Sequence, residues 1–83
     1  MVMYREVPKT TAEAIFKVLL DEGEQYGMPL RQKVSVLLGR DLAIGEIYAT
    51  CDVMEAAHVV SSRLGDPTPE RGRRHKKYWK ILQ

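Results

Sequence analysis

The sequence has little of what secreted and membrane-bound proteins depend on. It contains a single cysteine, Cys51, so no disulfide can form within the chain, which suits a reducing compartment. No apolar run approaches the roughly 20 residues that a helix needs to cross a bilayer. No charged segment followed by an apolar core and a small-residue cleavage site opens the chain. These absences predict a cytoplasmic protein that does not associate with a membrane.

Residues suited to catalysis and cofactor binding are also scarce. His58 and His75 lie far apart in the sequence, and with one cysteine they give no metal-ligand spacing. There is no glycine-rich phosphate loop, and no nucleophile is accompanied by a recognisable base and a group that orients it. The acidic residues between 21 and 24 are typical of a solvated corner between two elements. We therefore expect no enzymatic activity, no metal and no cofactor.

What the chain does have is the composition of one small globular domain, with 83 residues of which 45% are hydrophobic and 29% are charged. Its positive charge is concentrated at one end. Residues 1–58 carry six Lys or Arg against nine Asp or Glu, a balance of −3, whereas residues 59–83 carry seven against two, a balance of +5. A local cationic field attracts a polyanion to one face of a protein. A solvated, solubilising tail explains the same charges, and the cluster taken alone does not separate the two.

The first helix is predicted at about residues 10–22. Thr10 and Glu13 have the spacing of a capping box, in which each side chain satisfies a free backbone N–H of the first turn, and Gly23 supplies the end. Apolar residues recur at i, i+3, i+4, i+7 and i+8, the pattern of one helix face packed on a core. They are Ala12, Ile15, Phe16, Leu19 and Leu20.

Two further helices are predicted, at about residues 28–38 and 44–57. The second has Pro29 in its first turn, where the missing N–H costs nothing, and it ends at Gly39. The third follows a short turn, and its core-facing residues are Ile47, Tyr48, Cys51 and Met54. The opposite side of this helix carries small and nearly uncharged residues, so another surface can approach it closely.

The pattern changes after the third helix. Residues 59–64, "VVSSRL", are rich in β-branched side chains, and residues 75–82, "HKKYWKIL", become aromatic and apolar, so both are predicted as strands. The ten residues between them contain two prolines and two glycines, which excludes a helix and predicts a flexible loop. Three short helices followed by a β-hairpin are the element order of a winged helix-turn-helix. The expected fold is mainly α with a C-terminal β-hairpin, as one domain over residues 1–83.

Three segments resemble the PadR-like family of winged-helix transcriptional regulators, in the same order along the chain. "LLDEGEQYGMPLRQ", residues 19–32, is similar to the junction between the family's first two helices. "LAIGEIYATCDVMEAAHVVSSR", residues 42–63, resembles its recognition segment, and "GRRHKKYWKIL", residues 72–82, resembles its second wing strand. The resemblance covers roughly residues 11–82. It implies a winged-helix fold, binding of double-stranded DNA and a role in transcription regulation.

The sequence departs from the family pattern at three places. Glu46 occupies a position that usually carries a small hydroxyl residue, and His58 occupies one that usually carries glycine. The sequence also stops after the second wing strand, without the long C-terminal helices through which these regulators dimerise. This leaves open a homodimer formed through another surface, binding as a monomer, and service inside a larger protein assembly.

The predicted DNA-binding residues form three groups. The third helix of a helix-turn-helix enters the major groove, and the residues expected to face it are Glu46, Ala49, Thr50 and Val53. The second helix lies near the DNA backbone in the family's docking, and it offers Arg31 and Lys33. The wing offers phosphate contacts through Arg71, Arg73, Arg74, Lys76 and Lys77.

The third helix has a mixed set of groups for reading bases. Thr50 offers a hydroxyl for a base or a methyl for thymine. Glu46 is either an acceptor for cytosine N4 or only a favourable charge at a helix N-terminus. No Arg, Asn or Gln lies on this side, so strong bidentate recognition of bases is not expected. We expect the wing to make the main contacts, with Trp79 packed in the core behind it.

A second function class fits the same scaffold. The small, nearly neutral face of the third helix and the missing dimerisation helices favour a protein–protein interaction module with weak or no DNA binding. Such a module would be an accessory subunit, for example one encoded by a phage or plasmid.

Overall fold

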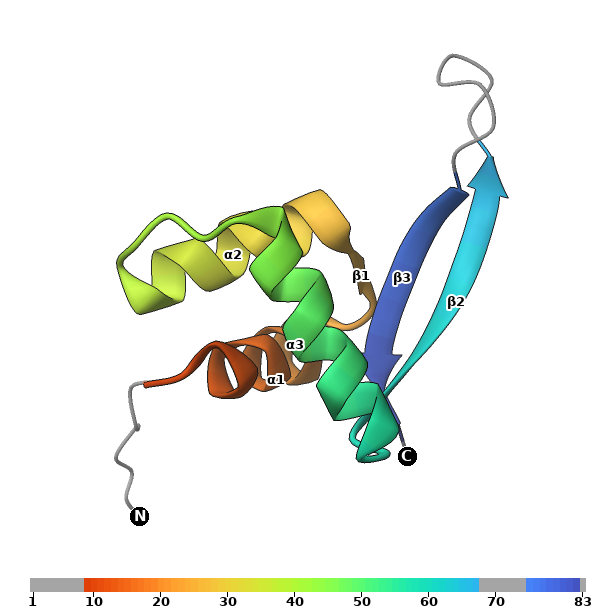
Figure 1. Ribbon diagram of the computed structural model, residues 1–83, viewed down its shortest axis with the longest axis horizontal. Coiled ribbons are helices and arrows are strands. Elements are labelled where there is room, and N and C mark those ends of the chain that lie inside the picture. Colours follow the sequence, from red (N-terminus) through yellow and green to blue (C-terminus); the bar gives the residue numbers. More distant parts are fainter. Residues whose placement is uncertain (1–8, 68–74, 83) are drawn as a thin grey trace.

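Three helices and a β-hairpin follow one another in the order that the sequence predicts (Figure 1). The structure is a computed structural model that describes residues 9–67 and 75–82. Its elements are α1 (Thr11–Glu22), β1 (Gln25–Tyr26), α2 (Gly27–Leu38), α3 (Ile44–Ala56), β2 (Val60–Pro67) and β3 (His75–Ile81). This arrangement is a winged helix-turn-helix, in which α2 and α3 form the helix-turn-helix and β2 and β3 form the wing. No helix in the described ranges is long and apolar enough to span a membrane.

Helix α1 begins and ends at the predicted signals, with one change in its capping. The Thr10 hydroxyl accepts a hydrogen bond from the Glu13 N–H at 3.1 Å. The Glu13 carboxylate reaches the N–H of Lys9, at 2.8 Å, one residue before the N–H expected for a capping box. The chain leaves the helix at Gly23, where φ is 84°, a value that favours glycine.

The buried face of α1 differs from the predicted one. Ile15 and Leu19 are buried as expected, whereas Phe16 is 38% exposed and Leu20 is 60% exposed. Ala14 and Val18 are buried in their place. The reason is that α2 and α3 pack against the opposite edge of the apolar stripe, so only that edge is covered. The remaining part of the stripe is an open apolar surface.

The core lies between the three helices and the inner side of the sheet. Trp79 is its largest fully buried side chain, which confirms its predicted place. The predicted face of α3 is also confirmed, because Ile47, Cys51 and Met54 are all buried. Burial raises the pKa of the Cys51 thiol to about 12, so this residue is an unreactive apolar member of the core. Tyr48, expected beside that face, is 39% exposed at its edge.

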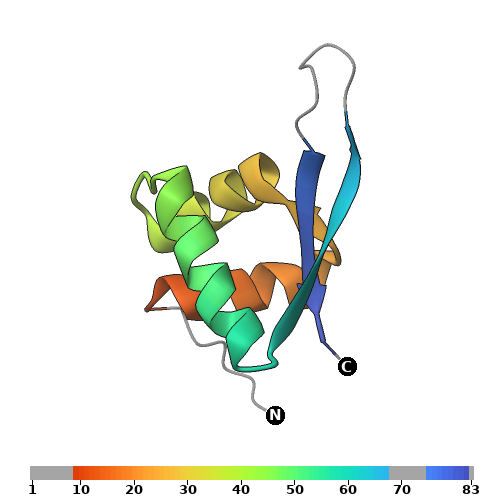
Figure 2. The same cartoon turned by 45° about the vertical axis from the view of Figure 1, so that its right-hand side comes forward.

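The sheet has three strands in the order β1-β3-β2, with both pairs antiparallel. Strand β1, which the sequence analysis did not predict, pairs Gln25 with Trp79 and Tyr26 with Tyr78. The hairpin strands stand beside the helices, and the end of β2 reaches past them (Figures 1 and 2). Strand β2 continues to Pro67, past the predicted end at residue 64, with an irregularity in its register between Leu64 and Pro67.

Candidate nucleic-acid interface

The turn between α2 and α3, residues 39–43, fixes the angle of the helix-turn-helix. Gly39 ends α2 in the left-handed conformation, with φ 71°. The Ser35 hydroxyl accepts a hydrogen bond from the Leu42 N–H at 3.1 Å. Arg31 Nη1 donates to the Leu42 carbonyl at 2.9 Å and lies 3.0 Å from Asp41 Oδ1. Arg31, which was predicted to contact phosphate, therefore stabilises this turn, and its side chain is only 21% exposed.

Lys33, the other predicted cation of α2, also contacts oxygen atoms of the protein. Its Nζ lies 2.8 Å from Glu22 Oε1 and donates to Gln25 Oε1 at 3.0 Å. These contacts tie α2 to the end of α1 and to β1. Arg31 and Lys33 thus hold partners within the protein, and phosphate binding by either of them stays a prediction.

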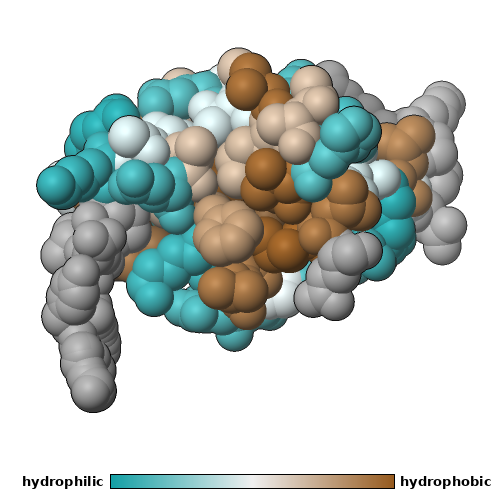
Figure 3. Space-filling view, turned by 90° about the horizontal axis from the view of Figure 1, so that it is seen from below, coloured by the Kyte–Doolittle hydropathy of each residue, from teal (hydrophilic) through white to brown (hydrophobic). Residues whose placement is uncertain are grey.

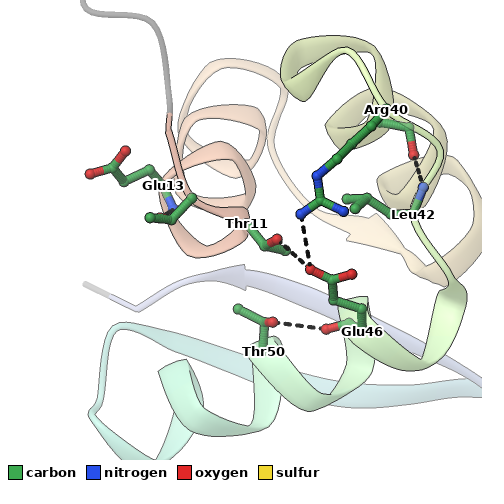
Figure 4. A network of polar contacts seen from close by, with 8 residues as sticks. Thr11, Glu13, Arg40, Leu42, Glu46 and Thr50 are labelled. Atoms are coloured by element: carbon green, nitrogen blue, oxygen red, sulfur yellow. Dashed lines mark hydrogen bonds and ion pairs between the residues drawn. The ribbon is translucent and has the colours of Figure 1, made fainter.

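Glu46 connects α3 to α1 (Figure 4). Thr11 Oγ1 donates to Glu46 Oε2 at 2.7 Å, and Arg40 Nη2 lies 3.4 Å from the same oxygen. The Thr11 hydrogen bond, helped by the Arg40 charge, holds the pKa of the Glu46 carboxyl below its ordinary value. Thr50, one turn further along, donates its hydroxyl to the Glu46 carbonyl at 2.8 Å. Both polar side chains predicted to read bases are thus engaged within the protein.

The other two carboxylates of α3 contact the wing. Asp52 Oδ1 lies 4.0 Å from Lys77 Nζ on β3, and Glu55 Oε2 accepts a hydrogen bond from the Ser62 hydroxyl on β2 at 2.9 Å. No Lys or Arg occurs in residues 41–62. Helix α3 is therefore an anionic element whose carboxylates each hold a different neighbouring element. The outward side chains that remain from the predicted set are those of Ala49 and Val53, both exposed.

Lys77 is the predicted wing cation whose side chain the structure describes. Lys77 is half-buried, and its ammonium lies 4.8 Å from the centroid of the Trp79 ring, a cation–π contact. Lys76 belongs to the same strand. Arg71, Arg73 and Arg74 lie outside the residues that the structure describes.

Arg40 and Arg63 are described cations that border the helix-turn-helix and the wing and were not predicted as site residues. Arg40 lies in the turn just before α3 with 57% of its side chain exposed. Arg63 makes a bidentate contact with Glu24, at 2.8 Å for both pairs of atoms, and its guanidinium lies 4.5 Å above the Tyr78 ring. The Arg63 hydrogen bonds lower the pKa of the Glu24 carboxyl. The position of Arg40 in the short turn was a signal available in the sequence, whereas the Arg63 pairing is too distant along the chain to be seen there.

A likeness among solved structures supports the fold. The crystal structure of Pex from Synechococcus sp. (strain PCC 7942) matches with a TM-score of 0.62 and 21% sequence identity. The match covers 93% of this chain and 71% of that chain. At this identity the likeness shows the winged helix-turn-helix fold alone. No protein-family model matches the chain, and no curated protein matches its sequence.

Proposed function

We propose that the chain is a small DNA-binding protein of PadR-like type that acts in transcription regulation in the cytoplasm. The observation that carries this proposal is a winged helix-turn-helix whose wing segment, residues 59–83, has a charge balance of +5. In such a fold α3 enters the major groove of double-stranded DNA and the wing lies along the backbone. The PadR-like assignment rests on the three segments that resemble that family in order.

The charges of the described residues suggest different roles in DNA binding for α3 and for the wing. Helix α3 carries carboxylates and no cation, so it repels phosphate and contributes little electrostatic affinity. Lys77 stands next to the outward carboxylate of Asp52 and offsets part of its charge. The wing cations therefore supply the salt-dependent affinity, while α3 contributes fit within the groove.

A salt titration of duplex binding tests this proposal. The apparent affinity of the full chain for a fluorescein-labelled 25-base-pair duplex is measured by anisotropy from low to physiological salt. We expect a steep loss, with a log–log slope of about −0.9 for each phosphate contacted. Arg73→Ala/Arg74→Ala is expected to reduce the slope by about two such contacts. The matched control, Arg5→Ala/Lys9→Ala, removes two cations at the other end of the sequence and is expected to leave the slope unchanged. Absence of binding at low salt, or an unchanged slope in the arginine variant, contradicts the proposal.

We also propose that the protein forms a homodimer through the open apolar surface of α1. Figure 3 shows apolar side chains gathered on this face, and the exposed ones on α1 and at the end of β3 are Phe16, Leu20 and Leu82. A second copy is the occupant because the flank of the surface is self-complementary. Lys17 and Asp21 lie side by side there, 2.9 Å apart, so an antiparallel copy of α1 related by a two-fold axis places each opposite its counter-ion.

Sedimentation equilibrium measures this dimer. We expect the mass of the wild-type protein to rise with concentration from one chain toward two, and Leu20→Glu to remain a single chain. Leu64→Glu is the matched control, because Leu64 is 63% exposed on β2, in the wing and not on this surface. A wild-type protein that stays a single chain up to about millimolar concentration, where even weak interfaces associate, contradicts the dimer.

The second candidate function is a protein–protein interaction module on the same scaffold. It is favoured by the lack of cations on α3, which is unusual for a helix that enters a polyanion's groove. The salt titration separates the two functions, because an interaction module gives weak or no binding to the duplex. Duplex binding that weakens with salt at the slope given above supports the DNA-binding function over the interaction module.

A further inference from the structure

The hydrogen-bonding side chains of α3 are turned away from the groove-facing side. Glu46 and Thr50 bond to Thr11 and to the helix backbone, and Glu55 bonds to Ser62. The hydroxyl end of Tyr48 lies against Gly27 at the start of α2. Asp52 remains as an acceptor at the edge nearest Lys77. The two hydroxyl donors of α3, on Thr50 and Tyr48, are thus directed at the helix backbone and at α2.

What projects instead is the isopropyl group of Val53. Its side chain is 68% exposed, on the side opposite the buried Ile47, Cys51 and Met54. A β-branched residue lowers helix propensity relative to alanine, and here the free protein buries little of its apolar surface in return. Ala49, one turn before it, is exposed and short, so Val53 stands above its surroundings. An exposed apolar side chain on the helix that enters the groove suits a ligand with an apolar group on the floor of that groove.

The major groove presents one such group, the C5-methyl of thymine. We propose that Val53 is the specificity-determining residue of α3 and that it selects A·T pairs through contact with this methyl group. The inference rests on the proposed DNA-binding function and assigns its source of sequence preference. The wing binds any backbone, and Val53 distinguishes thymine from cytosine by the presence of a methyl rather than by a hydrogen bond.

Replacement of thymine by deoxyuridine tests the inference, because the change removes the methyl and keeps the pairing. The probe is a 25-base-pair duplex that the 83-residue chain selects from a random pool at low salt. Its affinity is compared with that of the same duplex in which deoxyuridine replaces every thymine. For the wild type we expect about a fourfold loss for each methyl contacted, the effect of one buried methylene. Val53→Ala is expected to bind the thymine duplex more weakly and to show little further loss with deoxyuridine. Val36→Ala, the same change at an exposed position of α2, is expected to retain the full difference.

The outcomes separate this inference from the proposed function. Equal wild-type affinity for the two duplexes, with binding and its salt dependence intact, overturns the role of Val53 and leaves DNA binding standing. A full thymine–deoxyuridine difference in Val53→Ala also overturns it, since the methyl is then read elsewhere. No selection of any duplex at low salt refutes the proposed function itself, and the role of Val53 falls with it. A circular dichroism melt in which Val53→Ala unfolds no lower than the wild type shows that a folding defect is not the cause, because alanine is the better helix former at an exposed position.

Discussion

Arg31 either stabilises the turn between α2 and α3 or contacts the DNA backbone. Its replacement by methionine distinguishes these two roles. If the guanidinium braces the turn, Arg31→Met removes the hydrogen bond to the Leu42 carbonyl and the ion pair with Asp41 while keeping the apolar stem. The hydrogen bond has a charged donor but is only part-buried, so we place its contribution near the low end for such bonds, at about 1–1.5 kcal/mol. Asp41 is 92% exposed, so its pair adds at most about 0.5 kcal/mol. The sum predicts a loss of about 1.5 kcal/mol in the free energy of unfolding.

Thermal unfolding followed by circular dichroism measures this loss. For a domain of this size about 1.5 kcal/mol corresponds to a fall in Tm of roughly 6–12 °C. Asp41→Asn is the control, because it breaks the exposed ion pair and leaves the Leu42 bond, and we expect a fall of less than about 4 °C. At 10 °C, where both variants are folded, the salt slope of DNA binding is expected to match the wild type. An unchanged Tm in Arg31→Met together with a slope reduced by about one phosphate contact refutes the bracing role and makes Arg31 a backbone contact.

Three other predictions follow from single features of the structure. Asp52→Asn removes the outward charge of α3 and is expected to raise duplex affinity about twofold at low salt by anisotropy; an affinity that falls contradicts this. The pKa values of Glu24 and Glu46 are lowered by folding from 4.5, so their stabilisation is complete above that pH and is lost as pH falls through the lowered values. Urea unfolding at pH 7 and pH 3 checks this, with a smaller difference expected for Glu24→Gln/Glu46→Gln. His58 has φ 64°, so His58→Gly is expected to raise the free energy of unfolding by about 0.5–1 kcal/mol in urea; a loss of stability contradicts the strain.

Local signals in the sequence located most of the elements. Thr10 and Gly39 mark helix ends because capping depends on neighbours within one turn, and these are visible in the sequence. The spacing of Ile47, Cys51 and Met54 predicted the buried face of α3 for the same reason. Strand β1 was missed because two residues cannot show an alternating pattern, and its pairing with β3 joins segments about 50 residues apart.

The side chains that the sequence misplaced are those decided by distant neighbours. Phe16 and Leu20 continue an apolar stripe, and no local pattern tells which part of a wide stripe the rest of the protein covers. The sequence suggested that Glu46 either accepts from a base or only favours its own helix N-terminus. Its hydrogen bond to Thr11 was missed because that residue lies 35 positions away in the sequence. Of the site itself, the exposed positions of Ala49 and Val53 follow from periodicity alone. The engagement of Glu46, Thr50 and Arg31 does not, because each depends on how elements meet in space.

The two-residue strand β1 has a mechanical consequence. Tyr26 is followed directly by α2, and its strand is hydrogen-bonded to β3 opposite Trp79 and Tyr78. A force on the wing is therefore passed to the first turn of α2 without an intervening loop. The distance between the wing and the first turn of α2 is therefore held constant by the β1–β3 pairing. A DNA duplex that contacts both the wing and the first turn of α2 must have backbones separated by that distance. The width of its groove, and not only its sequence, therefore decides how well it binds.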